Sequence, residues 1–267
     1  MPRQSHSQLY RSGLSALSSQ LSAFISALPA SFETGGRVIY TGRNTLKSFR
    51  IDGRELIVKR YRRLSFARSL LYLGRTSKAR RAYEYAHEYL RRGIRTPEPL
   101  AYIDIRRGPL LHDSYFISLP LYAPDLTTLR RPDYDSHEVA LLSRFVYELQ
   151  QRGLLHGDLN LTNILLADAT ACDPLRRYAV IDLNRSRILP SGKLPTLSQR
   201  STNLMRLTHR RDLLRAILRS FPQLPAHNTR LITQTFRQLF RLEARKRFLH
   251  RIFSHCEDSI TKCKISF

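Results

Sequence analysis

The prevailing hydrophobic periodicity differs before and after about residue 121, and no other feature constrains the fold as strongly. Before that point, short segments alternate apolar and polar residues, which is typical of half-buried antiparallel strands. After it, apolar residues recur every three or four positions, as they do in amphipathic helices. The pattern predicts an α+β protein with a small antiparallel β-rich lobe over residues 1–122 and a larger helical lobe over residues 123–267.

Five short strands are expected in the β-rich lobe. They cover residues 37–40, 47–51, 55–61, 100–105 and 115–121. Turns are expected at Gly42 and at Asp52-Gly53, because glycine and Asp-Gly pairs between alternating segments are typical of hairpins.

Two helical regions are predicted in the same lobe. The first, residues 12–28, is amphipathic, and serines interrupt its apolar run, so a secretion signal is not expected. The second covers residues 64–92, with a break near Gly74. Its later turns carry one apolar face at helical spacing, made of Ala79, Ala82, Ala86 and Leu90.

The helical lobe opens with a marked helix start. Asp135, with Glu138 three residues later, predicts a capping box. Two short strands are expected at residues 163–166 and 178–183. Two further amphipathic helices, separated by prolines, are expected from Asn203 onward.

The net charge is +24, with 45 basic residues against 21 acidic ones, and arginine supplies 38 of the 45. The arginine fork pairs bidentately with phosphate and carboxylate, so a polyanionic partner is expected. Composition alone leaves nucleic acid, an anionic lipid surface and a phosphorylated glycolipid open. Every apolar run falls short of the ~20 residues that cross a bilayer. Three scattered cysteines without a CxxC pair argue against disulfides or zinc and fit a reducing cytosol.

The stretch from His156 to Asn163, HGDLNLTN, is the most informative for chemistry. Phosphoryl transfer needs a carboxylate to orient or deprotonate the acceptor hydroxyl, and acidic or amide ligands for Mg²⁺. Asp158 supplies the first, and Asn163 with Asp182, at the end of the next strand, supplies the second. A hairpin of the two short strands would bring Asn163 back towards Asp182. The alternative is a capped turn at Asp158 and a surface carboxylate at Asp182, which leaves the spacing unexplained.

These motifs resemble the protein-kinase-like superfamily. HGDxxxxN stands where protein kinases have HRDxxxxN, and Asp182-Leu183-Asn184 stands where they have DFG. Glycine at position 157 is similar to the sugar and small-molecule kinases and, more narrowly, to the lipopolysaccharide core kinases that phosphorylate Kdo or heptose. Segments 39–44 (IYTGRN), 98–100 (EPL) and 182–185 (DLNR) are also similar to that family. The resemblance spans about residues 36–190 and implies a protein-kinase-like two-lobe fold that uses ATP and Mg²⁺.

The resemblance further implies a strand lysine that contacts the α- and β-phosphates and a helix glutamate that holds it. Lys59, directly after Leu56-Ile57-Val58, matches the lysine. Glu84 or Glu88 matches the glutamate, and Glu84 is preferred because it falls where the family's glutamate is expected. The alternatives are an exposed edge-strand lysine and a surface pair of Glu84 with Arg80.

The loop expected to cover the nucleotide phosphates is the weakest match. Gly42-Arg43-Asn44 lacks a full GxGxxG motif, so Arg43 or Asn44 is expected to assist the backbone amides. An ordinary hairpin turn is the alternative. His156 is expected to orient the catalytic loop by hydrogen bonding, because nothing near it has the spacing of a zinc site.

Two basic segments are candidates for contact with an anionic acceptor or membrane. Arg185 and Arg187 follow Asp182 directly and are assigned to the carboxylate or phosphates of the acceptor, with a solvated basic loop as the alternative. The helix over residues 230–251 interleaves arginines with phenylalanine and leucine, which indicates either core packing or a surface that lies on an anionic membrane. Because lipid A is made at the inner leaflet, the resemblance implies a cytoplasmic protein at the periphery of the inner membrane.

We therefore predict an ATP- and Mg²⁺-dependent kinase that phosphorylates an inner-core sugar hydroxyl, Kdo before heptose, on an anionic glycolipid. A kinase for another small molecule or for protein serine and threonine is a second reading, although no APE-like segment follows Asp182. A third is a catalytically silent, kinase-shaped protein that binds anionic lipid or nucleic acid. The joint presence of Lys59, Asp158, Asn163 and Asp182 argues against it, so nucleic acid is not the expected partner. The sugar hydroxyl and the oligomeric state stay open.

Overall fold

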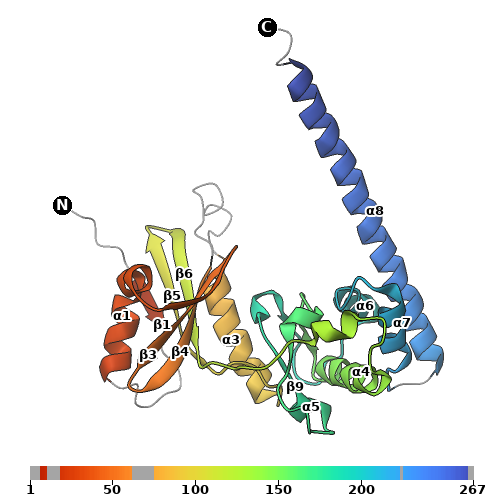
Figure 1. Ribbon diagram of the computed structural model, residues 1–267, viewed down its shortest axis with the longest axis horizontal. Helices are drawn as coiled ribbons and strands as arrows, with labels where there is room; N and C mark the ends of the chain where they lie inside the picture. The colour runs from red at the N-terminus through yellow and green to blue at the C-terminus, as the bar shows by residue number, and fades with distance from the viewer. Residues whose placement is uncertain (1–6, 11–18, 62–74, 223–224, 264–267) are drawn as a thin grey trace.

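The computed structural model describes residues 7–10, 19–61, 75–222 and 225–263, with side chains described for residues 19–61, 75–222 and 226–247. A sheet with helix α1 (Ser19–Thr34) on one side forms one end of the molecule, and a group of helices forms the other (Figure 1). Helix α3 (Lys78–Arg91) lies between the two parts. This two-part α+β arrangement agrees with the change of period in the sequence.

Six strands form one antiparallel sheet in the order β1-β5-β6-β4-β3-β2. They are β1 (Ser7–Tyr10), β2 (Arg37–Thr41), β3 (Thr45–Ile51), β4 (Arg54–Tyr61), β5 (Pro99–Arg107) and β6 (Leu110–Ser118). All five predicted strands are present, although β6 starts and ends earlier than predicted, and β1 is an addition. Asp52 and Gly53 both have positive φ, 50° and 72°, and join β3 to β4 through the expected tight turn.

Helix α1 differs from the predicted helix over residues 12–28. Residues 11–18 lie outside the described part of the chain, and the helix continues past Pro29 to Thr34. Proline removes one backbone hydrogen bond from a helix. Leu28 and Phe32 are fully buried against the sheet, and burial contributes about 1.5–3 kcal/mol for each such side chain. This packing offsets the lost hydrogen bond, so the helix persists.

Helix α3 begins at a cap. The Ser77 hydroxyl accepts a hydrogen bond from the Arg80 amide at 2.9 Å, which satisfies one free donor of the first turn. Residues 62–74 of the predicted helical region lie outside the described residues. The buried face consists of Ala79, Ala82, Tyr83, Ala86 and Tyr89. Leu90, assigned to this face from the sequence, is instead 37% exposed.

The remaining elements belong to the helical part. Its helices are α4 (Ser136–Gln151), α5 (Pro174–Arg177), α6 (Leu197–Leu204), α7 (Arg211–Arg219) and α8 (Pro225–Cys263). Its strands are β7 (Leu154–Leu155), β8 (Ile164–Leu166), β9 (Tyr178–Val180) and β10 (Arg187–Ile188), and its 3₁₀ turns are η1 (Leu126–Arg130), η2 (Leu161–Asn163) and η3 (Leu183–Arg185). β8 pairs with β9 in the expected hairpin.

The predicted capping box at the start of α4 is only half correct. The Asp135 carboxylate accepts from the His137 amide at 2.8 Å, as an N-cap should. Glu138 does not complete the box, because its carboxylate accepts hydrogen bonds from Arg177 and from the Tyr178 hydroxyl. These bonds tie α4 to the β8–β9 hairpin, on which the site depends.

The two helices expected from Asn203 onward are present as α7 and α8, and a further helix, α6, precedes them. Thr196 and Gln199 form a complete capping box, so α6 begins before that residue. Helix α8 packs Leu231 and Leu239 into the helical core and then extends away from the body of the molecule (Figure 1). No helix in the described ranges combines the length and apolarity needed to cross a bilayer.

Candidate active site

A cavity of about 290 Å³ lies between the sheet and the helical part. Most of its wall is apolar and includes Leu46, Ile57, Phe116, Leu119, Leu165 and Ile181. Lys59 and Asp182 are the two charged residues in that wall. An apolar cleft with a few polar groups that point into it can bind a ligand made of a flat aromatic base and a charged group.

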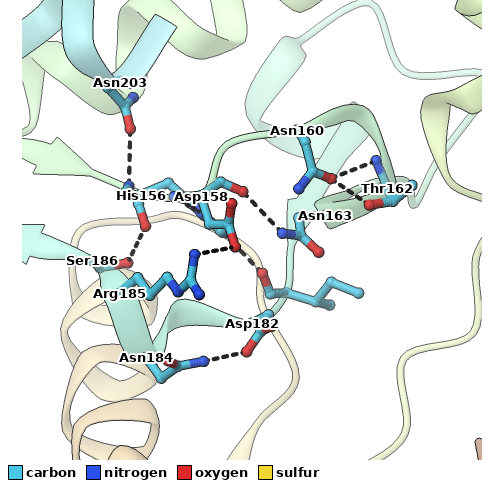
Figure 2. Close-up of polar contacts among 12 residues, drawn as sticks. His156, Asp158, Asn160, Thr162, Asn163, Asp182, Asn184, Arg185, Ser186 and Asn203 are labelled. Atoms are coloured by element: carbon cyan, nitrogen blue, oxygen red, sulfur yellow. Dashed lines mark hydrogen bonds and ion pairs between the residues drawn. The ribbon is translucent and has the colours of Figure 1, made fainter. Parts of the chain in front are cut away.

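Asp158 lies in the loop between β7 and β8, and its carboxylate meets Arg185 (Figure 2). The Asn163 side-chain amide donates to the Asp158 carbonyl at 2.9 Å and closes the loop across five residues. Within it, the Asn160 side chain accepts from the Thr162 amide at 3.0 Å and caps η2. The turn is therefore fixed from within, and the Asp158 carboxylate stays 28% exposed.

Glycine is required at position 157. The residue has a φ of 73°, a backbone conformation that residues with a side chain rarely adopt. A Cβ atom at this position would also overlap the carbonyl oxygen of Arg185. The Gly157 amide donates to the Asn203 side chain at 2.9 Å, which anchors the loop on α6. The glycine of the HGD motif thus lets the loop and η3 approach each other closely.

His156 is fully buried and organises the loop. Its Nε2 lies 2.9 Å from the carbonyl oxygen of Ile181, which can only accept, so Nε2 carries the proton. The Asp158 amide approaches Nδ1 at 3.4 Å. Burial lowers the pKa of His156, against the opposing influence of the Ile181 hydrogen bond and of the Asp182 and Asp158 charges. Burial thus favours the neutral ring, and its role in orienting the catalytic loop stays a prediction.

Asp182 stands at the end of β9 in a left-handed conformation, with a φ of 62°. This backbone state is uncommon for a residue other than glycine, and such strain is typical of functional positions. The Ile181 amide donates to the Asn163 carbonyl at 3.0 Å, which brings the two predicted metal ligands to neighbouring points of the hairpin.

The donor set of Asn163 and Asp182 fits a magnesium ion. The Asn163 amide nitrogen donates to the Asp158 carbonyl, and no described residue donates to the Asn163 side-chain oxygen, which is left to bind a metal ion. Lys59 and Asn184 both donate to Oδ1 of Asp182, which leaves Oδ2 without a donor in the described chain. One amide oxygen and one carboxylate oxygen are hard ligands of the kind that Mg²⁺ takes alongside phosphates and water.

Lys59 pairs with Asp182 and not with Glu84, so the predicted Lys59–Glu84 pair is wrong for this structure. The Lys59 ammonium lies 2.7 Å from Oδ1 of Asp182. Burial raises the pKa of Asp182, but the charge and hydrogen bond of Lys59 outweigh it, and the net pKa lies below its usual value. Glu84 pairs with Arg80 at 2.7 Å on the exposed side of α3.

The rotation of α3 about its own axis explains why neither glutamate contacts Lys59. Ala82 and Ala86 of α3 line the cleft. Glu84 and Glu88 lie two positions away from these alanines, about 200° around a helix with 3.6 residues per turn. Glu88, the second candidate, binds Arg91 and Arg92 at 2.6 Å each. Both glutamates therefore face away from Lys59.

The segment Gly42-Arg43-Asn44 forms the tight turn between β2 and β3. The Gly42 amide donates to the Asn44 carbonyl at 3.1 Å, and the Tyr40 ring lies so close to Gly42 that a Cβ there would collide with it. Gly42 and Arg43 are exposed and Asn44 is half-buried. The loop is a short hairpin, and its role over the phosphates stays a prediction.

Comparison with known proteins agrees with this geometry. The sequence model described as "Lipopolysaccharide kinase (Kdo/WaaP) family" matches residues 40–234. The chain belongs to the lipopolysaccharide kinase (Kdo/WaaP) family. Membership implies phosphotransferase activity of the kinase type. No curated protein matches the sequence.

Two solved structures are similar to this lipopolysaccharide kinase family member. The structure titled "WaaP in complex with acyl carrier protein" aligns with a TM-score of 0.54 at 19% identity, over 80% of this chain and 91% of that one. It shows that the fold is kinase-like. The Rio2 kinase–ADP/Mg²⁺–phosphoaspartate complex from Chaetomium thermophilum aligns with a TM-score of 0.49 at 17% identity, over 85% of this chain and 71% of that one.

The two arginines assigned to the acceptor occupy different environments in this lipopolysaccharide kinase family member. Arg185 of η3 pairs with the Asp158 carboxylate at 3.1 Å. Arg187 lies two residues further on, exposed, in the β10 strand that pairs with Leu155. The structure therefore brings Arg185, but not Arg187, into contact with the proposed catalytic carboxylate.

Sequence reasoning missed the side chains that hold the catalytic loop from behind. The Tyr89 hydroxyl of α3 lies 3.2 Å from the Ser186 hydroxyl, which in turn donates to the His156 carbonyl at 3.4 Å. All three residues are buried. A tyrosine and a serine 97 positions apart carry no local motif, so only the fold reveals the connection.

Proposed function

We propose that the protein is an ATP- and Mg²⁺-dependent kinase that phosphorylates a sugar hydroxyl of the lipopolysaccharide inner core. The observation that carries the proposal is the convergence of Asp158, Asn163 and Asp182 beside the apolar cleft that also contains Lys59. Phosphoryl transfer needs a carboxylate for the hydroxyl, two oxygen ligands for Mg²⁺ and a cation for the phosphates.

Each residue has a distinct role in this mechanism. Asp158 orients the acceptor hydroxyl and takes its proton as the oxygen attacks the γ-phosphorus, while the bond from that phosphorus to the β-phosphate oxygen breaks and ADP leaves. Asn163 and Asp182 would hold Mg²⁺, which when bound neutralises charge on the phosphate oxygens. Lys59 would turn from Asp182 to the α- and β-phosphates of ATP.

Neighbouring groups hold the backbone and the carboxylate of Asp158 in place. Its backbone is fixed by Asn163 and by neutral His156, and its carboxylate is paired with Arg185. The apolar wall of the cleft excludes water from the base of the nucleotide.

Kdo is proposed before heptose as the acceptor sugar. Its carboxylate is a partner for the arginine-rich surface, since guanidinium groups pair with carboxylates bidentately. Family membership supports an inner-core acceptor in general, and the choice of Kdo belongs to the proposal.

Peripheral contact with the inner membrane is proposed from the charge. The net charge is +24, and Arg241, Arg245, Lys246 and Arg247 are exposed on α8. Each cation near an anionic surface contributes about 1 kcal/mol of attraction. A cytoplasmic kinase for a membrane glycolipid benefits from such attraction.

An acceptor comparison tests the sugar. Purified protein is incubated with Mg²⁺, ATP and one of three acceptors: Kdo₂-lipid A, a heptose-extended core or lipid A without sugar. The products are analysed by mass spectrometry. One added phosphate on Kdo₂-lipid A alone supports the proposal. Phosphate only on the heptose-extended core would show that the phosphorylated hydroxyl belongs to heptose. Phosphate on sugar-free lipid A would overturn the inner-core assignment.

A further inference from the structure

Tyr61 ends strand β4 in the wall of the apolar cleft. Residues two positions apart in a strand point to the same face of the sheet, so Tyr61 shares its face with Lys59. Both residues line the cavity, and the Lys59 ammonium lies over the Tyr61 ring, 5.2 Å from its centroid. The same ammonium contacts Asp182 at 2.7 Å. A tyrosine therefore lies beside the ion pair that joins the two parts of the molecule.

Apolar packing holds the Tyr61 ring. The ring belongs to a small buried cluster that includes Ala79 and Ala82 of α3, and Tyr61 is only 3% exposed. The small alanine side chains leave room for an aromatic ring between α3 and the sheet. A phenylalanine would fill that space equally well, because packing uses the ring and not the hydroxyl.

The Tyr61 hydroxyl is buried and bonds to no residue that the structure describes. Such a group destabilises the folded state, because its hydrogen bonds to water are lost and are not replaced. Burial raises the pKa of Tyr61, and the charge of Asp182 raises it further. The hydroxyl therefore keeps its proton and can act as a donor.

Asp182 is the acceptor that this donor suits. Its Oδ1 atom accepts hydrogen bonds from Lys59 and from Asn184. Phosphoryl transfer requires the lysine at the nucleotide phosphates. Once Lys59 turns to them, Oδ1 loses one of these two donors, although the carboxylate has to stay in place for Mg²⁺.

We propose that Tyr61 is a positioning residue, whose hydroxyl replaces Lys59 as a donor to Oδ1 of Asp182 when Lys59 turns to the nucleotide phosphates. The inference rests on the proposed kinase function and adds an exchange of donors on the metal-binding carboxylate. Oδ1 keeps two hydrogen bonds before and after the exchange, and Oδ2 stays open to Mg²⁺. The hydroxyl gains its partner only when the nucleotide is bound.

The nucleotide itself is not the expected partner of this hydroxyl. Tyr61 lines the cavity, yet its hydroxyl oxygen is inaccessible to solvent. A ligand in the cavity therefore meets the ring before it meets the hydroxyl. Asp182 belongs to the same wall, and the Lys59 ammonium lies next to both side chains.

A double-mutant cycle without nucleotide tests the exchange. Lys59→Met imitates the departure of the ammonium from Asp182, and Tyr61→Phe removes the hydroxyl alone. The urea midpoints of the full-length wild type, both single variants and the double variant are compared. Tyr115→Phe, made in wild type and in Lys59→Met, is the matched control, because Tyr115 lies on the opposite face of the sheet against Phe32 of α1.

The expected effect of Tyr61→Phe depends on the background. In wild type it should leave the urea midpoint unchanged or raise it, because a buried polar group is removed. In Lys59→Met it should lower the midpoint, because the hydroxyl then bonds Asp182. Tyr115→Phe should shift the midpoint equally in both backgrounds.

Two results of this cycle overturn the proposal. A lower midpoint for Tyr61→Phe in the wild-type background would show that the hydroxyl already has a partner before nucleotide binds. Equal shifts in the two backgrounds would show that the hydroxyl does not reach Asp182 when Lys59 is absent.

Calorimetric titration with AMP-PNP and Mg²⁺ tests the role in nucleotide binding. We expect the affinity of Tyr61→Phe to be about tenfold weaker, the effect of one hydrogen bond to a charged group, and that of Tyr115→Phe to equal wild type. A loss of affinity without a loss of stability separates a positioning role from a structural one, and wild-type affinity in Tyr61→Phe overturns the proposal. Failure of wild type to bind AMP-PNP counts against the kinase proposal alone, and the cycle still decides whether the hydroxyl reaches Asp182.

Discussion

Lys59 of β4 and Asp182 at the end of β9 are 123 residues apart in sequence, and their side chains meet at 2.7 Å. The pair joins the sheet to the helical part across the cleft. It also keeps the proposed phosphate-binding cation and the proposed metal-binding carboxylate in contact with each other. Glu84, the partner expected from the family resemblance, is turned to the opposite side of α3.

Removal of Lys59 tests whether it supports Asp182. Lys59→Met is expected to abolish tight Mg-ATP binding and to lower the free energy of unfolding by about 1–3 kcal/mol, because a largely buried carboxylate loses its cation. Adding Asp182→Asn should restore most of the stability and none of the binding. Urea unfolding of both single variants and the double variant measures this coupling, and strictly additive losses would contradict a direct pair.

Glu84→Gln should be nearly silent. The residue contacts Arg80 on an exposed surface, and such a pair is worth about 0–1 kcal/mol. Nucleotide affinity and transfer rate are therefore expected to stay within about twofold of wild type, a change below 0.5 kcal/mol. A loss of about a hundredfold or more in steady-state kinetics would show that Lys59 uses Glu84 during turnover.

Gly157→Ala is expected to destabilise the protein through a steric clash as well as through backbone strain. Gly192 is its matched control, since it has a φ of 76° with no atom within 4 Å of a built Cβ. Both substitutions bear the left-handed cost of about 1–2 kcal/mol, and only Gly157→Ala also meets the Arg185 carbonyl. Chemical denaturation should therefore give Gly157→Ala a clearly lower free energy of unfolding than Gly192→Ala. Equal stabilities would mean that the loop and η3 separate at no cost.

Buried His156 makes stability depend on pH. Burial holds its pKa below the ordinary value of 6.5, so the unfolded chain binds a proton that the folded chain does not. The neutral His156 therefore makes its full contribution to the free energy of unfolding above about pH 6.5. Below that pH the free energy of unfolding falls, by up to about 1.4 kcal/mol per pH unit for this one group. Unfolding free energies between about pH 7 and pH 5 should show this slope in wild type and in the exposed control His137→Gln. The slope should be reduced in His156→Gln, and an unchanged slope there would assign the effect to other groups.

The elements of the β-rich part were predictable because each follows from local pattern. Alternating residues and the Asp52-Gly53 turn specify β3 and β4 without reference to the rest of the chain. The HGD loop was predictable for a related reason. Its internal bonds, such as that of Asn163 to the Asp158 carbonyl, join residues close in sequence.

Contacts between distant elements were not predictable from local pattern. The partner of Lys59 depends on how α3 is rotated against the sheet, which packing of Ala82 and Ala86 decides. The sequence did contain a sign of this rotation, because the alanine face lies opposite Glu84. Glu138 was misassigned for a similar reason: its carboxylate accepts hydrogen bonds from Arg177, 39 residues away, and does not bond its own helix start.

Transfer of labelled γ-phosphate from ATP to Kdo₂-lipid A, in wild type and Asp158→Asn, tests the central claim most directly. We predict Mg²⁺-dependent labelling of the glycolipid by wild type, and a rate about 10²–10⁴-fold lower in Asp158→Asn with ATP affinity retained, because the variant loses its proton acceptor. Labelling by Asp158→Asn at the wild-type rate, or labelling that persists without Mg²⁺, would contradict the assignment of Asp158, Asn163 and Asp182 to phosphoryl transfer.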